Sequence, residues 1–115
     1  MPNQHTLNEP VAFTGIGLHT GCSVSLTLRP APPGTGGVYR RTDLDGFPVE
    51  ARSVNVANVN YATTLMKKGV LVSTVEHLMS ALYGLGVDNV FADLDNLEVP
   101  ILDGSAWPYV ERILE

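Results

Sequence analysis

Apolar and polar side chains alternate most clearly between residues 22 and 29, where Val24, Leu26 and Leu28 are separated by polar residues. This period of two predicts a half-buried strand of an antiparallel sheet. Similar but less clear patterns predict further strands over residues 5–14, 38–41, 61–67, 70–74 and 87–94. The strands over residues 61–67 and 70–74 are expected to form a hairpin through Lys68-Gly69.

A helical period replaces the alternation over residues 73–84. Ser73 is expected to cap this helix, with Glu76 at the third following position as in a capping box, and Gly84 is expected to end it. The expected core-facing stripe consists of Val75, Leu78, Met79 and Leu82.

A second helix is expected over residues 106–115, with Ser105 or Asp103 as its cap. Its expected apolar stripe consists of Trp107, Val110, Ile113 and Leu114. The polar, irregular stretch 47–60 is expected to leave the sheet. The order of strands, helix, strand and helix predicts an α+β two-layer sandwich, with a mostly antiparallel sheet and two helices on one face.

The side of the first helix that faces away from the apolar stripe carries His77 among the small residues Ser80, Ala81 and Gly84. Small residues allow close approach of another backbone, so this side is expected to be covered. Two interpretations of His77 stay open. It is either a structural histidine beside a capping Glu76, or a metal ligand or proton-transfer group with Glu76 as a general base.

Three glycines lie within residues 15–21, which predicts a tight turn, most simply a hairpin loop. A phosphate-binding loop is not expected, because no helix follows and no Gly-Lys-Ser/Thr is present. Cys22, the only cysteine, is interpreted as a small strand residue.

Composition narrows the classes of function. The 115 residues are 44% hydrophobic and 17% charged, as expected for one globular domain, and the net charge of −5 argues against nucleic-acid binding. The chain has no apolar run long enough for a membrane span and no signal-peptide pattern at its N-terminus. Together with the single cysteine, this predicts a cytoplasmic protein.

Four motifs then form a pattern together: residues 14–21 (TGIGLHTG), 39–43 (YRRTD), 73–78 (STVEHL) and 100–105 (PILDGS). In this order and spacing the chain resembles the UDP-3-O-acyl-N-acetylglucosamine deacetylases, zinc amidases of bacterial lipid A biosynthesis. The resemblance implies a protein of two similar domains with the active site between them. Residues 1–115 would form the N-terminal domain as a single unit, similar to the second domain of ribosomal protein S5.

The resemblance also implies roles for particular residues. His77 would bind zinc, and Glu76 would be the general base. Leu18, His19, Ala62 and Thr63 would lie on the substrate side of the site. Residues from about 38 to 60 would form an insert-like excursion near it.

The zinc site implied in this way is incomplete. A catalytic zinc normally has three protein ligands, and the other family ligands lie in a second domain with no counterpart here. His5 and Glu9 are expected to be too far apart on a strand to share a metal. The chain alone is therefore expected to be inactive towards its UDP-3-O-acyl-N-acetylglucosamine-type substrate and to need a missing C-terminal catalytic domain. Self-association through the exposed inter-domain face is a further expectation, and a binding or regulatory module without catalysis is the alternative.

Overall fold

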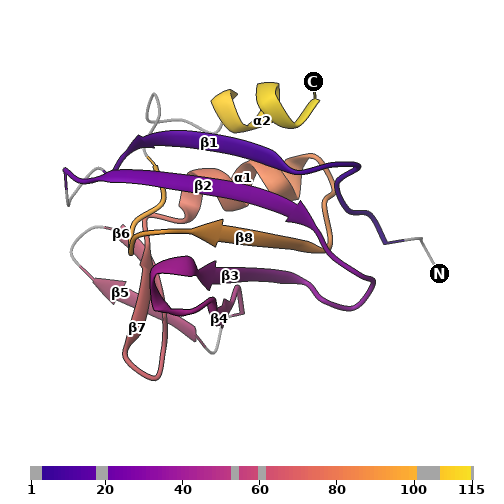
Figure 1. Ribbon diagram of the computed structural model, residues 1–115. Helices are drawn as coiled ribbons and strands as arrows, with labels where there is room; N and C mark the ends of the chain where they lie inside the picture. Colours follow the sequence, from indigo (N-terminus) through magenta and orange to yellow (C-terminus); the bar gives the residue numbers. More distant parts are fainter. Residues whose placement is uncertain (1–3, 18–20, 53–54, 60–61, 101–106, 115) are drawn as a thin grey trace.

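The computed structural model describes residues 4–17, 21–52, 55–59, 62–100 and 107–114. These residues form two sheets and two α-helices (Figure 1). Along the chain the elements are β1 (Val11–Ile16), β2 (Ser23–Pro30), β3 (Gly37–Arg41), a short 3₁₀ helix (Thr42–Leu44), β4 (Phe47–Glu50), β5 (Val56–Val59), β6 (Ala62–Lys67), β7 (Val70–Ser73), α1 (Glu76–Gly84), β8 (Val90–Leu94) and α2 (Trp107–Leu114).

The larger sheet has five strands in the order β1-β2-β8-β3-β4. The strand nearest the C-terminus, β8, therefore lies in its middle (Figure 1). Only β3 and β8 pair in parallel, and the other three pairings are antiparallel. The expected mostly antiparallel sheet is confirmed.

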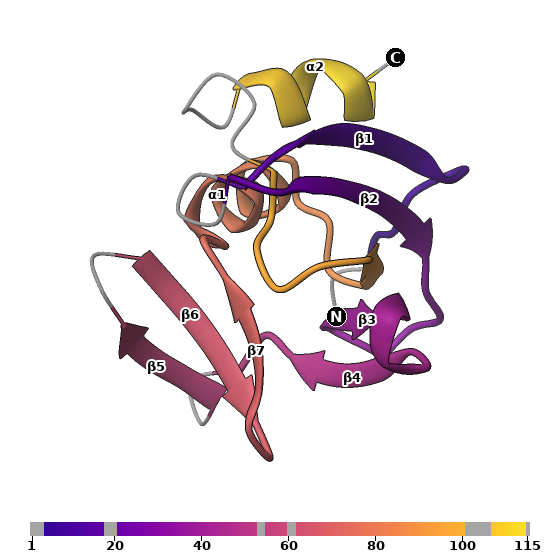
Figure 2. The ribbon, with the colours of Figure 1, turned by 60° about the vertical axis from the view of Figure 1, so that its left-hand side comes forward.

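The core lies between one face of this sheet and the two helices. Leu26 and Leu28 of β2 and Leu94 of β8 are fully buried there, as their alternation predicts. Helix α1 adds Leu78 to the same cluster, and Tyr109 of α2 packs edge-on against Phe13 of β1, with ring centroids 4.9 Å apart. Both helices thus cover one face, which confirms the two-layer α+β sandwich (Figures 1 and 2).

Charged side chains link three strands across the other face of the sheet. Asp93 of β8 accepts hydrogen bonds from Arg29 of β2 at 3.0 Å and from Arg40 of β3 at 2.5 and 2.8 Å. The Arg40 guanidinium also lies 4.0 Å from the centre of the Phe91 ring. Because these groups are partly exposed, each ion pair adds at most about 1 kcal/mol to stability.

The smaller sheet has the order β5-β6-β7, and β7 continues toward α1 (Figure 2). The predicted hairpin between β6 and β7 is confirmed. Its turn residues Lys68 and Gly69 have φ values of 50° and 81°. Two positive φ values in a two-residue loop are the pattern of a type I′ turn, whose twist suits antiparallel strands.

A buried arginine joins the two sheets. Arg41, at the end of β3, donates a hydrogen bond from Nη1 to the Leu71 carbonyl of β7 at 2.7 Å. Its Nε and Nη2 donate to Asp43 at 2.9 and 2.6 Å, and these bonds hold the pKa of the Asp43 carboxyl below its usual value. Lys67 of β6 and Glu50 of β4 form a second link at 2.8 Å.

Two segments differ from the sequence predictions. The stretch 47–60 does not leave the larger sheet as a whole, because β4 pairs with β3 and places Val49 in the core. The first strand begins at Val11 and not at His5. The backbone of His5 is instead hydrogen-bonded to Asp88 and to the Asn89 amide, and Pro10 has no N–H to donate to a neighbouring strand.

Candidate functional site

Helix α1 begins without the predicted capping box. Its N-cap residue is Val75, and no side chain accepts a hydrogen bond from the first turn at that position. Ser73 lies in β7, and its hydroxyl is 3.1 Å from that of Thr64 in the neighbouring strand. The capping prediction is wrong because the serine belongs to the sheet, two residues before the helix cap.

The turn into α1 is fixed by a different segment of chain. The Ser73 N–H donates to the Leu97 carbonyl at 2.6 Å, and the Val99 N–H donates to the Ser73 carbonyl at 3.0 Å. Residues 97–99 therefore run beside the end of β7 as a short parallel bridge. Between these bonds, the hydroxyl of Thr74 donates to Oε2 of Glu98 at 2.5 Å.

Glu76 and His77 occupy the first turn of α1, directly after this turn. Both residues are partly buried. Neighbouring helix positions point about 100° apart, and the two groups therefore diverge from one short stretch of backbone. The next residue, Leu78, is fully buried and anchors this turn of the helix in the core.

Tyr39 of β3 interacts electrostatically with Glu76. Burial raises the pKa of the Tyr39 phenol strongly, and the nearby Tyr109 and the negative charge of Glu76 raise it further. The ring is 2% exposed, and its hydroxyl has no hydrogen-bond partner among the residues that the structure describes.

Replacing Tyr39 with Phe is expected to leave the free energy of unfolding unchanged or to raise it by up to about 1 kcal/mol, because a buried hydroxyl without a partner costs desolvation energy. Urea unfolding of the 115-residue chain measures this. A loss of more than 1 kcal/mol would show that the hydroxyl has a stabilising partner.

Two further segments approach the start of α1. Gly17, after β1, forms a bridge with Pro100, so residues 97–100 connect the helix start to the β1–β2 loop. The Gly17 N–H donates to the Cys22 carbonyl and the Gly21 N–H to the Gly17 carbonyl, both at 3.0 Å, which confirms the hairpin interpretation of residues 15–21. Leu18 and His19 lie outside the described residues.

The β6 strand brings the other predicted substrate residues toward the same region. Ala62 and Thr63 begin β6, opposite Val59 and Asn58 of β5. The next residue, Thr64, pairs with Ser73 at the end of β7, so the first residues of β6 run beside the turn into α1 (Figure 2). This end of β6, Gly17 and the start of α1 therefore lie in one region of the structure.

The side of α1 opposite the apolar stripe was expected to carry Ser80, Ala81 and Gly84 and to be covered. Ser80 and Gly84 are instead exposed in this chain, and Ala81 belongs to the buried core cluster. Ala81 is three positions after Leu78 and one before Leu82, so it lies within the width of the buried stripe. Tyr83, at 89% exposed, is the largest apolar group on the uncovered side.

Helix α2 also differs in detail. Its bounds agree with the prediction within one residue, but Leu114 is exposed and Tyr109 is fully buried. The Tyr109 hydroxyl donates to the Pro100 carbonyl at 2.5 Å, and burial raises the pKa of this phenol. Tyr109 thus attaches α2 to the segment that holds the turn before α1.

The described residues contain no cluster of three or more His, Cys, Asp or Glu side chains suited to a metal ion. His77 is therefore a single candidate ligand. His5 and Glu9 are both exposed and precede β1, so the strand geometry expected for them is wrong.

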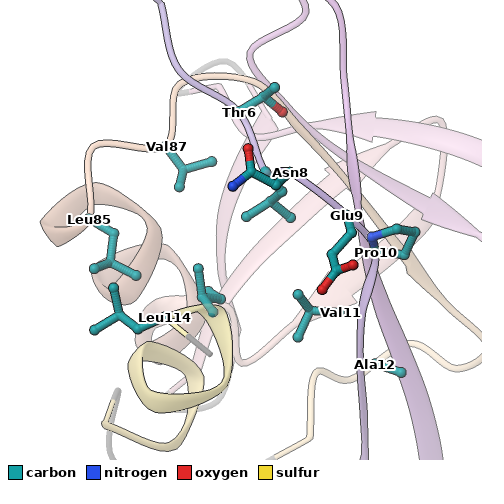
Figure 3. A pocket seen from close by; sticks show the side chains of 11 residues that line it. Thr6, Asn8, Glu9, Pro10, Val11, Ala12, Leu85, Val87 and Leu114 are labelled. Atoms are coloured by element: carbon teal, nitrogen blue, oxygen red, sulfur yellow. The ribbon is translucent and has the colours of Figure 1, made fainter.

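A cavity of about 380 Å³ lies at the opposite end of α1 (Figure 3). Leu85 and Val87 after α1, Leu114 of α2 and residues 6–12 line it. Neither Glu76 nor His77 contributes to it. The sequence patterns did not predict this cavity, because it forms where three distant segments meet.

The sequence analysis did not identify Thr74 or Glu98 either, although the position of Glu98 in the sequence is unusual. Glu98 is the only acidic residue within the short apolar stretch 97–102 before Asp103 ends it. Such an isolated acid indicates a buried partner. No pattern in the sequence indicated that Thr74 takes a positive φ of 61°.

Comparison with known proteins defines the family. Residues 4–115 match the family described as UDP-3-O-acyl N-acetylglycosamine deacetylase. Proteins named UDP-3-O-acyl-N-acetylglucosamine deacetylase share 54% identity over 110 residues in Solibacter usitatus, 52% over 111 in Geobacter sp. strain M21 and 55% over 112 in Nitrosococcus oceani. Each match covers 96% of this chain but only 36–37% of the relative.

The α+β domain with an acid and an imidazole at one helix start is thus a domain of a hydrolase family whose members are deacetylases. The chain belongs to the UDP-3-O-acyl N-acetylglycosamine deacetylase family. It spans just over a third of the length of the curated relatives quoted above. In the ranges that the structure covers, neither helix has the length and apolar character needed to cross a bilayer.

Proposed function

We propose that this chain is the N-terminal domain of a zinc-dependent deacetylase that releases acetate from UDP-3-O-acyl-N-acetylglucosamine in lipid A biosynthesis. Membership of the deacetylase family carries the proposal. The adjacent Glu76 and His77, both partly accessible at the start of a well-packed helix, support it with groups suited to amide hydrolysis.

In this proposal Glu76 accepts a proton from the water that attacks the acetamide carbonyl. Positioned carboxylates are common general bases, and α1 is held on the core by Leu78 and Leu82. A base on a packed helix needs little reorganisation during the reaction, which favours this role over that of a helix cap. The capping alternative also loses its support, since Ser73 does not cap α1.

His77 is proposed as a zinc ligand. The chemistry that a bound zinc ion supplies is polarisation of a carbonyl group and acidification of water. A catalytic zinc site needs three protein ligands, and the described residues provide one candidate. His77 therefore fits one side of such a site, and we propose that a C-terminal domain supplies the remaining ligands.

Leu18, His19, Ala62 and Thr63 are proposed to contact the substrate. The support is indirect: Gly17 before the first pair and the β6 backbone around the second pair both lie near the start of α1. Residues from about 38 to 60 would contribute through β5, which pairs with the same end of β6. The exposed Tyr83 lies on the side of α1 proposed to face the C-terminal domain or, without it, a second copy.

The proposal is tested with the chain alone and with a chimera in which it replaces the matching segment of the Solibacter usitatus relative. The chain alone is expected to release no acetate from UDP-3-O-acyl-N-acetylglucosamine and to bind zinc weakly in calorimetry. The chimera is expected to bind one zinc ion and to deacetylate, and to lose both properties with His77→Ala.

Two outcomes would contradict this proposal. Tight one-to-one zinc binding by the chain alone would mean that it holds a complete site. A folded, zinc-loaded chimera without activity would favour a binding or regulatory module. Light scattering over a range of concentrations shows whether the chain alone self-associates.

A further inference from the structure

The residue before the helix cap has a strained backbone. Thr74 has a φ of 61°, in the left-handed region that β-branched residues rarely adopt. Thr74 is 3% exposed, so the strained residue lies inside the protein. Strain of this kind persists only when surrounding contacts hold it.

Glu98 provides the side-chain contact that holds it. Glu98 is 1% exposed, and its carboxyl group accepts a hydrogen bond from the Thr74 hydroxyl at 2.5 Å. The backbone on either side of Glu98 is joined to Ser73 through the Leu97 carbonyl and the Val99 N–H. One segment, 24 residues further along the chain, therefore forms hydrogen bonds both with the backbone of Ser73 and with the side chain of Thr74.

These hydrogen bonds lie directly before Glu76 and His77 in the chain. Only Val75 separates Thr74 from Glu76, and α1 has no side-chain cap of its own at that end. A change in the Thr74 backbone would therefore rotate the first helical turn and move Glu76 and His77 relative to groups outside α1. Small displacements of reacting groups reduce catalytic rates strongly.

We propose that Thr74 and Glu98 are positioning residues that set the orientation of Glu76 and His77 through the left-handed turn between β7 and α1. The catalytic part of this inference rests on the proposed deacetylase function. Its structural part concerns this chain by itself.

Thr74→Gly is the decisive variant, since glycine adopts a positive φ without strain but has no hydroxyl for Glu98. In the chimera it is expected to lower kcat about 10- to 100-fold, with KM changed by less than about threefold. In ¹H–¹⁵N spectra of the 115-residue chain it should shift the amide signals of residues 76–78. Thr74→Ser keeps the hydroxyl and is expected to preserve kcat within about threefold.

Val90→Ala is the matched control, because it removes buried methyl groups from the first residue of β8, three positions after Val87 of the cavity at the opposite end of α1. It is expected to lower the melting temperature while leaving kcat and the amide signals of residues 76–78 near their wild-type values. A variant that loses stability alone would behave in this way.

Wild-type kcat and unshifted amide signals in Thr74→Gly would overturn the inference, and so would a Thr74→Ser variant as impaired as Thr74→Gly. If the wild-type chimera is itself inactive, the proposed function fails instead. In that case the amide signals of Thr74→Gly and Thr74→Ser in the chain alone still decide whether the hydroxyl orients the helix start.

Discussion

Glu76→Gln in the chimera is expected to lower kcat for deacetylation by about 10²- to 10⁴-fold, the usual contribution of a positioned general base. The amide has nearly the same shape as the carboxylate but cannot accept the proton of the attacking water. Initial rates of acetate release across a range of substrate concentrations measure the effect. The loss should appear in kcat with little change in KM.

Zinc content separates this effect from loss of the metal. His77 is unchanged in Glu76→Gln, so the variant is expected to retain one zinc ion per chain. Ser80→Ala, one turn along the exposed side of α1, is the matched control and should keep kcat within about twofold of wild type. Retention of more than a tenth of wild-type kcat by Glu76→Gln would exclude Glu76 as the base.

Tyr109→Ala is expected to lower the free energy of unfolding by about 3–5 kcal/mol, the range for removing a large buried aromatic ring. Tyr109 is fully buried, packs against Phe13 and donates a hydrogen bond to the Pro100 carbonyl. The variant therefore loses ring contacts with β1 and the attachment of α2 to residues 97–100. Urea unfolding of the 115-residue chain measures the change.

Tyr109→Phe separates the ring from its hydroxyl. It keeps the packing on Phe13 and is expected to cost about 0.5–1.5 kcal/mol, the net value of one hydrogen bond. The expected result for Tyr39→Phe, which removes a hydroxyl without a described partner, has the opposite sign or is zero. A loss below 1 kcal/mol in Tyr109→Ala would mean that α2 contributes little to the fold.

Much of the fold could be predicted because the relevant patterns are local. The alternation at Val24, Leu26 and Leu28 depends only on which face of β2 is buried. Lys68-Gly69 predicts its turn because few residue pairs tolerate two positive φ values. The start of α1 was less accurate, since Ser73 is a residue type that often caps helices but is hydrogen-bonded within the sheet.

The contacts between distant segments could not be predicted from local patterns. Neither the parallel pairing of β3 with β8 nor the bond from Thr74 to Glu98 has a short sequence signature. Glu76 and His77 were found because they are adjacent in a motif. The residues proposed to orient them were missed because their roles depend on a strained φ and on a partner far along the chain.

The central place of β8 has a consequence for the order in which this domain becomes stable. The strands on either side of it, β2 and β3, are not hydrogen-bonded to each other. Before residues 90–94 are synthesised, the larger sheet can exist only as two separate hairpins, β1–β2 and β3–β4. Isolated hairpins are at best marginally stable in water. Nearly the whole of this sequence must therefore leave the ribosome before the sheet can form as one cooperative unit.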